Sequence, residues 1–316
     1  MTAIASGDLL LLLAAIPLAA LGGEAFLRGV LGIAAWLRLP KLLVATTLAA
    51  FATSSPELTV STLAALAGKP EIGLGDSLGS NVVNIGLILG VALLFGALAA
   101  HFTEIKRDFL MALAVPVFTL ILALDGTLSR ADGALLLALF ALWLALVVRQ
   151  AMQHRRNNAT AGEESAREST SSPLRAWLFV AVGLACLILA GRLFVTGASG
   201  IAVALGVNAY VIGATVVAVG TSLPEMVTML LARLRGHDDI GLGTLLGSNL
   251  FNGLAIVGVT AAIHPIQAPI GGVAVALGFG VLTVLLILPR AGAISRQRGL
   301  VLLAAYAAFV TTTLTF

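Results

Sequence analysis

The amino-acid sequence predicts an all-α integral membrane protein of ten transmembrane helices, arranged as two inverted five-helix repeats. Three observations lead to this prediction: an apolar composition, a series of long apolar segments, and an internal duplication. Of the 316 residues, 59% are hydrophobic and only 10% are charged, which excludes an ordinary water-soluble domain. The sequence lacks the alternating pattern of a membrane β-barrel, so we expect helices, which satisfy their own backbone polar groups.

The expected helices are runs of apolar residues long enough to cross a bilayer core of about 30 Å, which takes about 20 residues. In chain order they are 8–36, 40–67, 72–98, 107–124, 130–149, 175–205, 208–234, 240–263, 269–288 and 296–315. The first run has neither a basic leader nor a small-residue cleavage pattern. We therefore expect a retained helix rather than a signal peptide.

A polar segment at 150–174, low in aromatic residues and rich in Ser, Glu and Arg, interrupts this series. We expect it to be a flexible linker between a first repeat, 1–149, and a second repeat, 175–316. Each repeat contains five of the expected helices. Because an odd number of spans begins and ends on opposite sides of the membrane, two such units in tandem are inverted relative to each other.

The basic residues agree with this arrangement, since cytoplasmic loops carry an excess of Lys and Arg. Only Lys69 and Arg130 fall on the face opposite the linker. The face that carries the linker has Arg38, Lys41, Lys106, Arg107, Arg149, Arg155, Arg156, Arg167, Arg175, Arg233, Arg235, Arg290, Arg296 and Arg298. We predict a bacterial or archaeal plasma membrane protein with a cytoplasmic linker and both termini outside.

The duplication has a constant offset of 168 residues. TLAAFATSSPELTV at 47–60 recurs as TVVAVGTSLPEMVT at 215–228, and GSNVVN at 79–84 recurs as GSNLFN at 247–252. The copies lie within 44–90 and 212–258. Each places a carboxylate, Glu57 or Glu225, directly after a proline in an apolar segment, where a charge is costly and therefore indicates function.

Pro56 lacks a backbone donor, and its ring clashes with the carbonyl of Ala52, so the second helix is expected to break there. Thr53 and Ser54 supply hydroxyl oxygens beside this break, next to the Glu57 carboxylate. The second copy supplies the same groups from Gly220, Thr221, Ser222, Pro224 and Glu225. Freed carbonyls, hydroxyls and carboxylates are hard oxygen donors of the kind that bind Ca²⁺ and Na⁺.

The GSN segments predict a second pair of helix interruptions, since serine and asparagine next to glycine favour local unwinding. Ser80 and Asn84 lie one turn apart on one helix face, and Ser248 and Asn252 repeat them. If the halves are inverted, all four breaks meet near the bilayer midplane. Two facing carboxylates then match one divalent cation.

Each motif, taken alone, is also compatible with a purely structural role. An isolated SPE is typical of a proline kink with a capping Glu, and an isolated GSN of close helix packing. Their repetition in register favours a site. No His lies near either motif, and Cys186 is the only cysteine, which argues against zinc or copper.

The remaining polar residues fit simpler structural roles. The GASG at 197–200 is similar to the serine motif of intramembrane proteases, but His101, His154, His237 and His264 all fall at helix ends or in loops. Small-residue packing accounts for it better, and we do not expect an enzyme. We expect the charged groups of Glu24, Arg28 and Arg192 to snorkel toward the membrane surface or to form ion pairs. We expect Asp76 to lie at a helix entrance. Asp238 and Asp239 are expected to lie in a solvated turn.

On these motifs the chain resembles the calcium/cation antiporter superfamily, which includes the sodium/calcium exchangers and their prokaryotic relatives. The resemblance covers all ten expected helices. It implies an ion site built from the second, third, seventh and eighth helices. It also implies that the tilted first and sixth helices slide against the rest to alternate access.

The resemblance further implies the ligands. Glu57 and Glu225 would bind calcium, helped by the backbone carbonyls of Thr53 and Thr221. The implied sodium sites draw on Ala50, Thr53, Ser54 and Ser80 in one half and on Ala218, Thr221, Ser222 and Ser248 in the other, with Asn84 and Asn252 completing the middle. Asn252 stands where some exchangers carry Asp, so this site has one carboxylate fewer, which weakens the case for potassium co-transport.

The leading hypothesis is a cation antiporter that exports Ca²⁺ in exchange for Na⁺. The alternatives are H⁺-driven exchange of Ca²⁺ or another divalent cation on the same scaffold, and a channel or a non-transporting scaffold. We expect no cofactor, no nucleic acid and no obligate protein partner, only small inorganic cations and the lipid bilayer. A linker of about 25 residues is too short for a folded regulatory domain.

Overall fold

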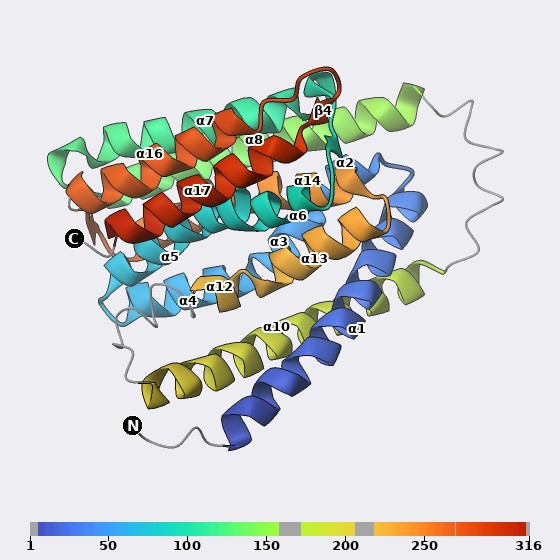
Figure 1. The fold of residues 1–316 in the computed structure, drawn as a ribbon. Helices are drawn as coiled ribbons and strands as arrows, with labels where there is room; N and C mark the ends of the chain where they lie inside the picture. Colours follow the sequence, from blue (N-terminus) through green and yellow to red (C-terminus); the bar gives the residue numbers. More distant parts are fainter. Residues whose placement is uncertain (1–5, 158–171, 206–217, 269, 314–316) are drawn as a thin grey trace.

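The computed structural model describes residues 6–157, 172–205, 218–268 and 270–313, and within them the chain is almost entirely helical (Figure 1). By length and composition, six of the described helical stretches can cross a membrane, and Lys41–Thr53 and Gly271–Leu286 are shorter apolar helices. The uninterrupted helices are α1 (Ser6–Leu37), α7 (Phe102–Leu122), α8 (Arg130–Asn157), α10 (Pro173–Ala204), α16 (Ile270–Leu286) and α17 (Arg296–Thr313).

The helices that carry the duplicated motifs are subdivided. In the first copy the order is α2 (Lys41–Val44), η1 (Ala45–Ala49), α3 (Ala50–Thr53), α4 (Ser55–Leu66), α5 (Pro70–Val82), η2 (Val83–Leu89) and α6 (Gly90–Leu94). In the second it is α12 (Ala218–Thr221), α13 (Leu223–Leu234), α14 (Asp238–Leu250), η5 (Phe251–Ile256) and α15 (Val257–Ile263). The segments η1, η2 and η5 are π-helical.

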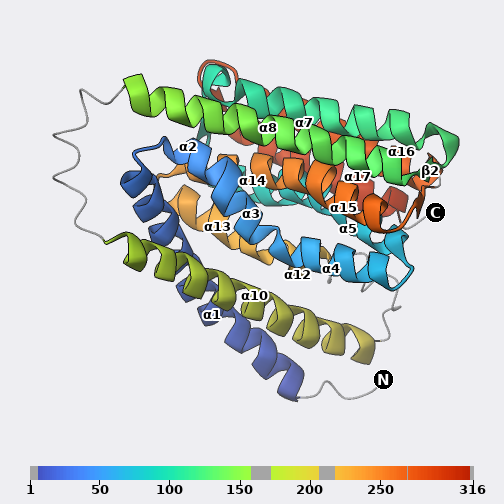
Figure 2. The same ribbon diagram turned by 180° about the vertical axis from the view of Figure 1, so that it is seen from behind.

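Short strands join loops that are distant in sequence, which the all-helical prediction did not include. β1 (Leu98–Ala99) pairs antiparallel with β4 (Ala293–Ile294), and β2 (Thr127–Leu128) pairs with β3 (Ile266–Gln267). Loops joined in this way share one end of the molecule. The first pair lies at the end where α8 finishes and α10 begins, and the second pair lies at the opposite end, where α1 begins (Figures 1 and 2).

Several predicted boundaries are wrong by a few residues. The helix expected at 72–98 ends at Leu94, because a turn and β1 follow it. The helix expected at 107–124 begins at Phe102. The edges of the expected linker are helical, since α8 continues to Asn157 and α10 begins at Pro173. The rest of that linker and the start of the helix expected at 208–234 lie outside the described residues.

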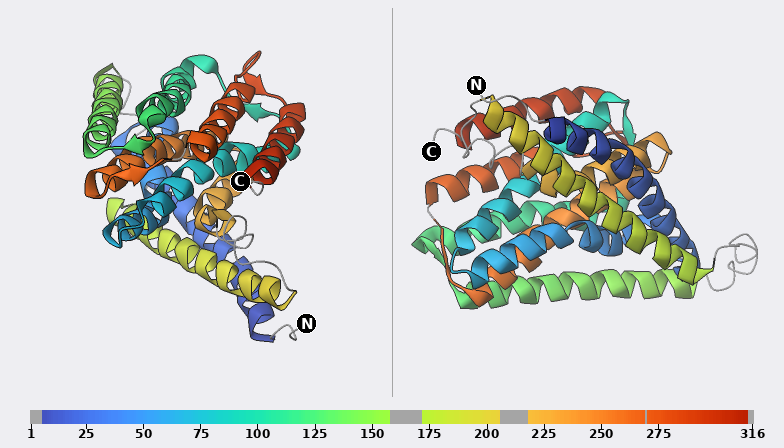
Figure 3. Two further views of the ribbon diagram at one scale, coloured as in Figure 1. Left: turned by 90° about the vertical axis from the view of Figure 1, so that its left-hand side faces the viewer. Right: turned by 90° about the horizontal axis from the view of Figure 1, so that it is seen from below.

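The helices form two groups. α1 and α10 pack against each other along their length and lie together beneath the other helices (Figures 1 and 3). Glycines allow their close approach: a Cβ on Gly183 would lie 2.4 Å from the backbone N of Phe26, and one on Gly197 would lie 2.5 Å from the carbonyl O of Asp8. The GASG segment is therefore a helix-packing element, as predicted.

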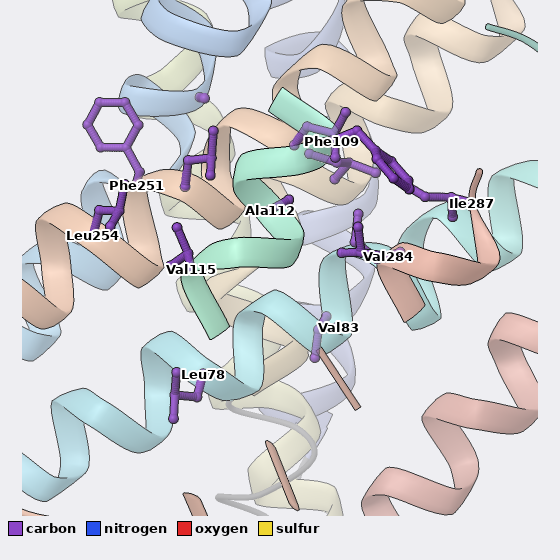
Figure 4. Close-up of a cluster of buried hydrophobic side chains, with 14 of the residues drawn as sticks. Leu78, Val83, Phe109, Ala112, Val115, Phe251, Leu254, Val284 and Ile287 are labelled. Carbon is purple, nitrogen blue, oxygen red and sulfur yellow. The ribbon is translucent and has the colours of Figure 1, made fainter. Parts of the chain in front are cut away.

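The larger group is built around an apolar core formed by α5, η2, α7, η5 and the C-terminal end of α16 with the residue after it (Figure 4). It contains Leu78, Val83, Phe109, Ala112, Val115, Phe251, Leu254, Val284 and Ile287. Large apolar side chains such as Leu21, Leu142 and Leu178 are exposed on the outer faces of α1, α8 and α10. This exposure is expected of helices that face lipid.

Candidate cation site

The two SxPE motifs break their helices at the same place. Ser54 separates α3 from α4 with φ −84° and ψ 7°, and Ser222 separates α12 from α13 with φ −83° and ψ 12°. Each following proline lies in the first turn of the next helix, where its missing N–H costs no helical hydrogen bond. The predicted breaks are confirmed in both copies.

The repeated glycines after these helices also have matching backbones. Gly68 and Gly236 both have φ 73°, a left-handed conformation that glycine adopts without a Cβ penalty. The next residue closes a helix-ending turn in each copy: the N–H of Lys69 donates to the carbonyl O of Ala64 at 2.9 Å, and that of His237 donates to Ala232 at 2.8 Å. The sequence duplication is thus also a duplication of local structure.

Glu57 and Glu225 are both buried, with 1% exposure. The hydroxyls of Ser54, from the other copy, and Ser248 donate to Oε1 of Glu225 at 3.2 and 3.1 Å. The hydroxyls of Thr53 and Ser248 lie 3.4 Å apart. Glu225 therefore accepts hydrogen bonds from hydroxyls of both copies.

Ser80 also contributes a hydroxyl to this region. The Ser222 hydroxyl donates to the Ser80 hydroxyl at 3.5 Å, which is a long hydrogen bond. Ser222 also lies close to Glu57, as Ser54 lies close to Glu225. The serines at the two helix breaks therefore each approach the glutamate of the opposite copy.

Asn81 and Asn249 join the two copies by reciprocal hydrogen bonds. Nδ2 of Asn81 donates to the carbonyl O of Asn249 at 3.3 Å, and Nδ2 of Asn249 donates to the carbonyl O of Asn81 at 3.1 Å. Nδ2 of Asn84 also donates to Oδ1 of Asn249 at 3.0 Å. Reciprocal hydrogen bonds between two equivalent residues indicate a local twofold axis.

The GSN segments are not unwound, contrary to the prediction. α5 continues through Ser80 to Val82 and α14 continues through Ser248 to Leu250, and both then widen into π-helix. Asn84 and Asn252 lie in these π segments. The local widening keeps the helix hydrogen-bonded, and π turns are frequent at functional sites.

Several buried oxygens in this region accept no hydrogen bond from any residue that the structure describes: Oε2 of Glu57 and Glu225, and Oδ1 of Asn84 and Asn252. Buried polar atoms are normally paired. Within the described ranges, no group of three His, Cys, Asp or Glu side chains is placed to hold a metal ion. The arrangement therefore suits a hard cation held by two carboxylates together with hydroxyl, amide and carbonyl oxygens.

The structure gathers most of the sequence-predicted site residues. The buried ones are Ala50, Thr53, Ser54, Glu57, Ser80, Asn84, Ser222, Glu225, Ser248 and Asn252. Thr221 is partly exposed, and the side chain of Ala218 lies outside the described residues. The prediction gave no role to Asn81 and Asn249, although both belong to the repeated GSN motif.

A cavity of about 460 Å³ reaches the two helix breaks. Its walls include Ser55 and Pro56 from the first copy, Gly220 and Thr221 from the second, and Arg192 from α10. These residues place it on the half of the molecule toward which α4 and α10 run, opposite the end where α10 begins (Figure 2).

Several other ionisable residues form ion pairs with one another. Glu24 accepts from Arg28 at 2.8 Å and from Arg235 at 2.9 Å, so the predicted pairing is confirmed for these groups. Asp238 is not in a solvated turn: it begins α14, forms an ion pair with Arg233 at 2.8 Å and accepts from the N–H of Ala99 at 2.9 Å. The chain turns back at this point, and the pair holds β1 against α14.

A helical membrane protein that brings buried carboxylates, hydroxyls and amide oxygens together from two copies of one motif is, by class, a transporter of small inorganic cations. Comparisons with known proteins agree. The family model described as "Sodium/calcium exchanger protein" matches residues 8–149 and 175–315. The chain belongs to the sodium/calcium exchanger family, whose members are antiporters rather than enzymes.

Relatives occur in bacteria and archaea. CaxA of Alkalimonas amylolytica is 35% identical over 290 residues, covering 90% of this chain and 91% of the relative. The sodium/calcium exchanger MaX1 of Methanosarcina acetivorans is 28% identical, with 92% and 93% covered. Among solved structures, the sodium-calcium exchanger NCX_Mj soaked with Na⁺ and Sr²⁺ superposes with a TM-score of 0.82 at 28% identity, covering 96% of this chain and 98% of that one.

Proposed function

We propose that this protein exports Ca²⁺ in exchange for Na⁺ by alternating access. The observation that carries the proposal is the pair of buried carboxylates, Glu57 and Glu225, one from each copy, each with an oxygen that accepts no hydrogen bond from the described residues. Ca²⁺ and Na⁺ compete for the same oxygen ligands, so filling the site with one displaces the other. The similarity to MaX1 and NCX_Mj, both named as sodium/calcium exchangers, supports the choice of these two ions.

The proposed ligands follow the two copies. Glu57 and Glu225 bind Ca²⁺ with the carbonyls of Thr53 and Thr221. Sodium is bound by Ala50, Thr53, Ser54 and Ser80 in one half, by Ala218, Thr221, Ser222 and Ser248 in the other, and by Asn84 and Asn252 between them. The burial of most of these residues in one region supports the assignment.

The proposed architecture is ten transmembrane helices in two inverted five-helix repeats, 1–149 and 175–316, joined by a cytoplasmic linker at 150–174. Both termini lie outside a prokaryotic plasma membrane. The reciprocal hydrogen bonds between Asn81 and Asn249 support a twofold axis through the site, and an axis in the membrane plane requires inverted halves. The excess of basic residues around the linker supports the orientation.

Alternating access is proposed to arise from movement of α1 and α10 against the other helices. This pair packs along its own length and meets the rest of the molecule mainly through α2, α12 and α13. The cavity beside Arg192 lies next to both helix breaks and is the proposed access route in this conformation. Movement of the pair would close this route and open another at the opposite end.

The decisive experiment measures Ca²⁺ uptake into proteoliposomes that contain the purified chain. With Na⁺ inside and none outside, uptake is expected, and it should disappear when choline replaces Na⁺ or when Glu57→Gln is introduced. The rival function, H⁺-driven exchange, is favoured by the same unpaired carboxylate oxygens, which can carry protons. Uptake driven by a pH gradient without sodium would establish the rival and refute Na⁺ coupling.

A further inference from the structure

Asp76 is an acidic residue of α5 to which the proposed exchange cycle gives no role. It lies four residues before Ser80 and eight before Asn84, and residues at this spacing line one face of a helix. Asp76 therefore lies slightly more than one helical turn, or about 6 Å along the axis, from Ser80 toward the start of α5. It belongs to the second turn of the helix, deeper than the entrance position that the sequence suggested.

The carboxylate is only partly satisfied. Oδ2 of Asp76 is buried and has no hydrogen-bond partner among the described residues, while the residue as a whole retains partial exposure. Asp76 lies within electrostatic reach of Glu57 and Glu225. α5 also packs against α12, which contributes Gly220 and Thr221 to the cavity wall.

Asp76 has no acidic counterpart in the second copy. The equivalent residue is Thr244, which is fully buried and donates its hydroxyl to the carbonyl O of Ile240 at 2.9 Å. Thr244 thus satisfies itself within its own helix, whereas Asp76 leaves a buried oxygen unpaired. The fold accepts an uncharged residue at this position, so packing does not require the carboxylate.

We propose that Asp76 is an outer cation-binding station, on which a cation binds before it passes to the site between Glu57 and Glu225. Asp76 does not join the two glutamates in one cluster of three, since no such group exists within the described ranges. It is a neighbouring position on the approach from the end where α5 begins. Because Thr244 offers no such station on α14, the two faces of the protein differ in how they capture cations.

This inference rests on the proposed function and is tested separately from it. Exchange is measured in proteoliposomes of known orientation, with the Ca²⁺ concentration varied on one face at a time. For Asp76→Asn and Asp76→Thr, the KM on the face where α5 begins should rise by about fivefold or more. The KM on the other face should stay within about twofold, and kcat should be retained.

Glu71→Gln is the matched control, because Glu71 is an exposed acid in the first turn of the same helix. It should leave both KM values unchanged. Asp76→Thr copies the residue of the second repeat, which keeps the test valid where Asp76→Asn does not fold. An equal change in KM on both faces, or none on either, overturns the proposal.

A second readout does not depend on exchange. Stopped-flow mixing of Ca²⁺ with the solubilised full-length protein should show association slowed by about fivefold or more in Asp76→Thr and unchanged in Glu71→Gln. Absence of exchange in the wild-type protein would contradict the proposed function alone. Unchanged Ca²⁺ association in Asp76→Thr would contradict the outer station alone.

Discussion

Replacing Glu225 with Gln should weaken Ca²⁺ binding and yet stabilise the cation-free protein. Gln has nearly the same shape, and its amide oxygen can still accept from Ser54 and Ser248, which lie 3.2 and 3.1 Å from Oε1. What the substitution removes is the negative charge. Without a cation, Glu225 and Glu57 repel each other in a buried site, so removing one charge relieves that repulsion.

The magnitude follows from burial. Both glutamates are 1% exposed, and removing one partner from a buried charge pair costs about 3–5 kcal/mol. The Kd for Ca²⁺ should therefore rise between about a hundredfold and a few thousandfold. At a Ca²⁺ concentration of about 100 times the wild-type Kd, bound Ca²⁺ stabilises the wild type by about 2.7 kcal/mol. At the same concentration the variant gains less than about 0.5 kcal/mol.

The assay is thermal unfolding of the purified protein in detergent, with a chelator and then with saturating Ca²⁺. The wild-type Tm should rise by about 5–10 °C on adding Ca²⁺. Glu225→Gln should start from a higher Tm in the chelator and show almost no further rise. Glu57→Gln should behave in the same way, because the two glutamates occupy equivalent positions of the repeated motif.

Glu104→Gln is the control, since Glu104 is an exposed acid in the first turn of α7, away from the site. It should keep the full Ca²⁺-dependent rise in Tm. The reasoning fails if Glu225→Gln retains that rise, because Ca²⁺ would then bind elsewhere. It also fails if the variant is less stable than the wild type in the chelator, because the two carboxylates would then not repel each other in the empty site.

Three further predictions concern residues around the site. Asn81→Ala should lower the free energy of unfolding by about 1–3 kcal/mol. The substitution removes the donor to the carbonyl O of Asn249, while the bond from Nδ2 of Asn249 to the backbone of residue 81 remains. Chemical or thermal unfolding tests this, and an unchanged Tm would contradict it. Arg192→Gln should lower the KM for cations on the cavity face by about threefold, since a guanidinium in the cavity wall repels them; a rise in KM would refute this. Arg235→Gln removes the 2.9 Å ion pair with Glu24. Because a mostly exposed ion pair is worth about 0–1 kcal/mol, the exchange rate should change by up to about fivefold. The Kd for Ca²⁺ measured in detergent should stay the same.

Much of this site could be predicted from the sequence because its signals are local. Pro56 cannot continue a helix without losing a hydrogen bond, so the break beside Ser54 follows from one residue. The positive φ of Gly68 follows from the same kind of argument. The equivalence of the two copies follows from their constant offset, without any knowledge of how they pack.

Other features depend on contacts between distant segments and could not be predicted. Asn81 and Asn249 donate to each other's carbonyls only because the two copies meet back to back. The π-helical turn at Asn252 lengthens a helical repeat by one residue, a change that hydrophobic periodicity does not record. The ion pair of Asp238 needs Arg233 from the preceding helix, whereas two acidic residues just after a glycine predict only a turn.

The duplication also shows where the two ends of the molecule differ. The same 168-residue offset that pairs Glu57 with Glu225 pairs Glu24 on α1 with Arg192 on α10. It also pairs Ala67 with Arg235. On one end, Glu24 reaches Arg235 and ties α1 to the end of α13. On the other, Arg192 faces a cavity, and Ala67 offers it no charge to pair with.

A cation held between equivalent glutamates makes similar contacts whichever end is open, and a ligand shifts a conformational equilibrium only through differential affinity. In the proposed alternating-access cycle, the balance between the two access states is therefore expected to depend on residues that the repeats do not share, such as the Glu24–Arg235 pair. For this reason Arg235→Gln is expected to change the rate of exchange and not the affinity of the central site.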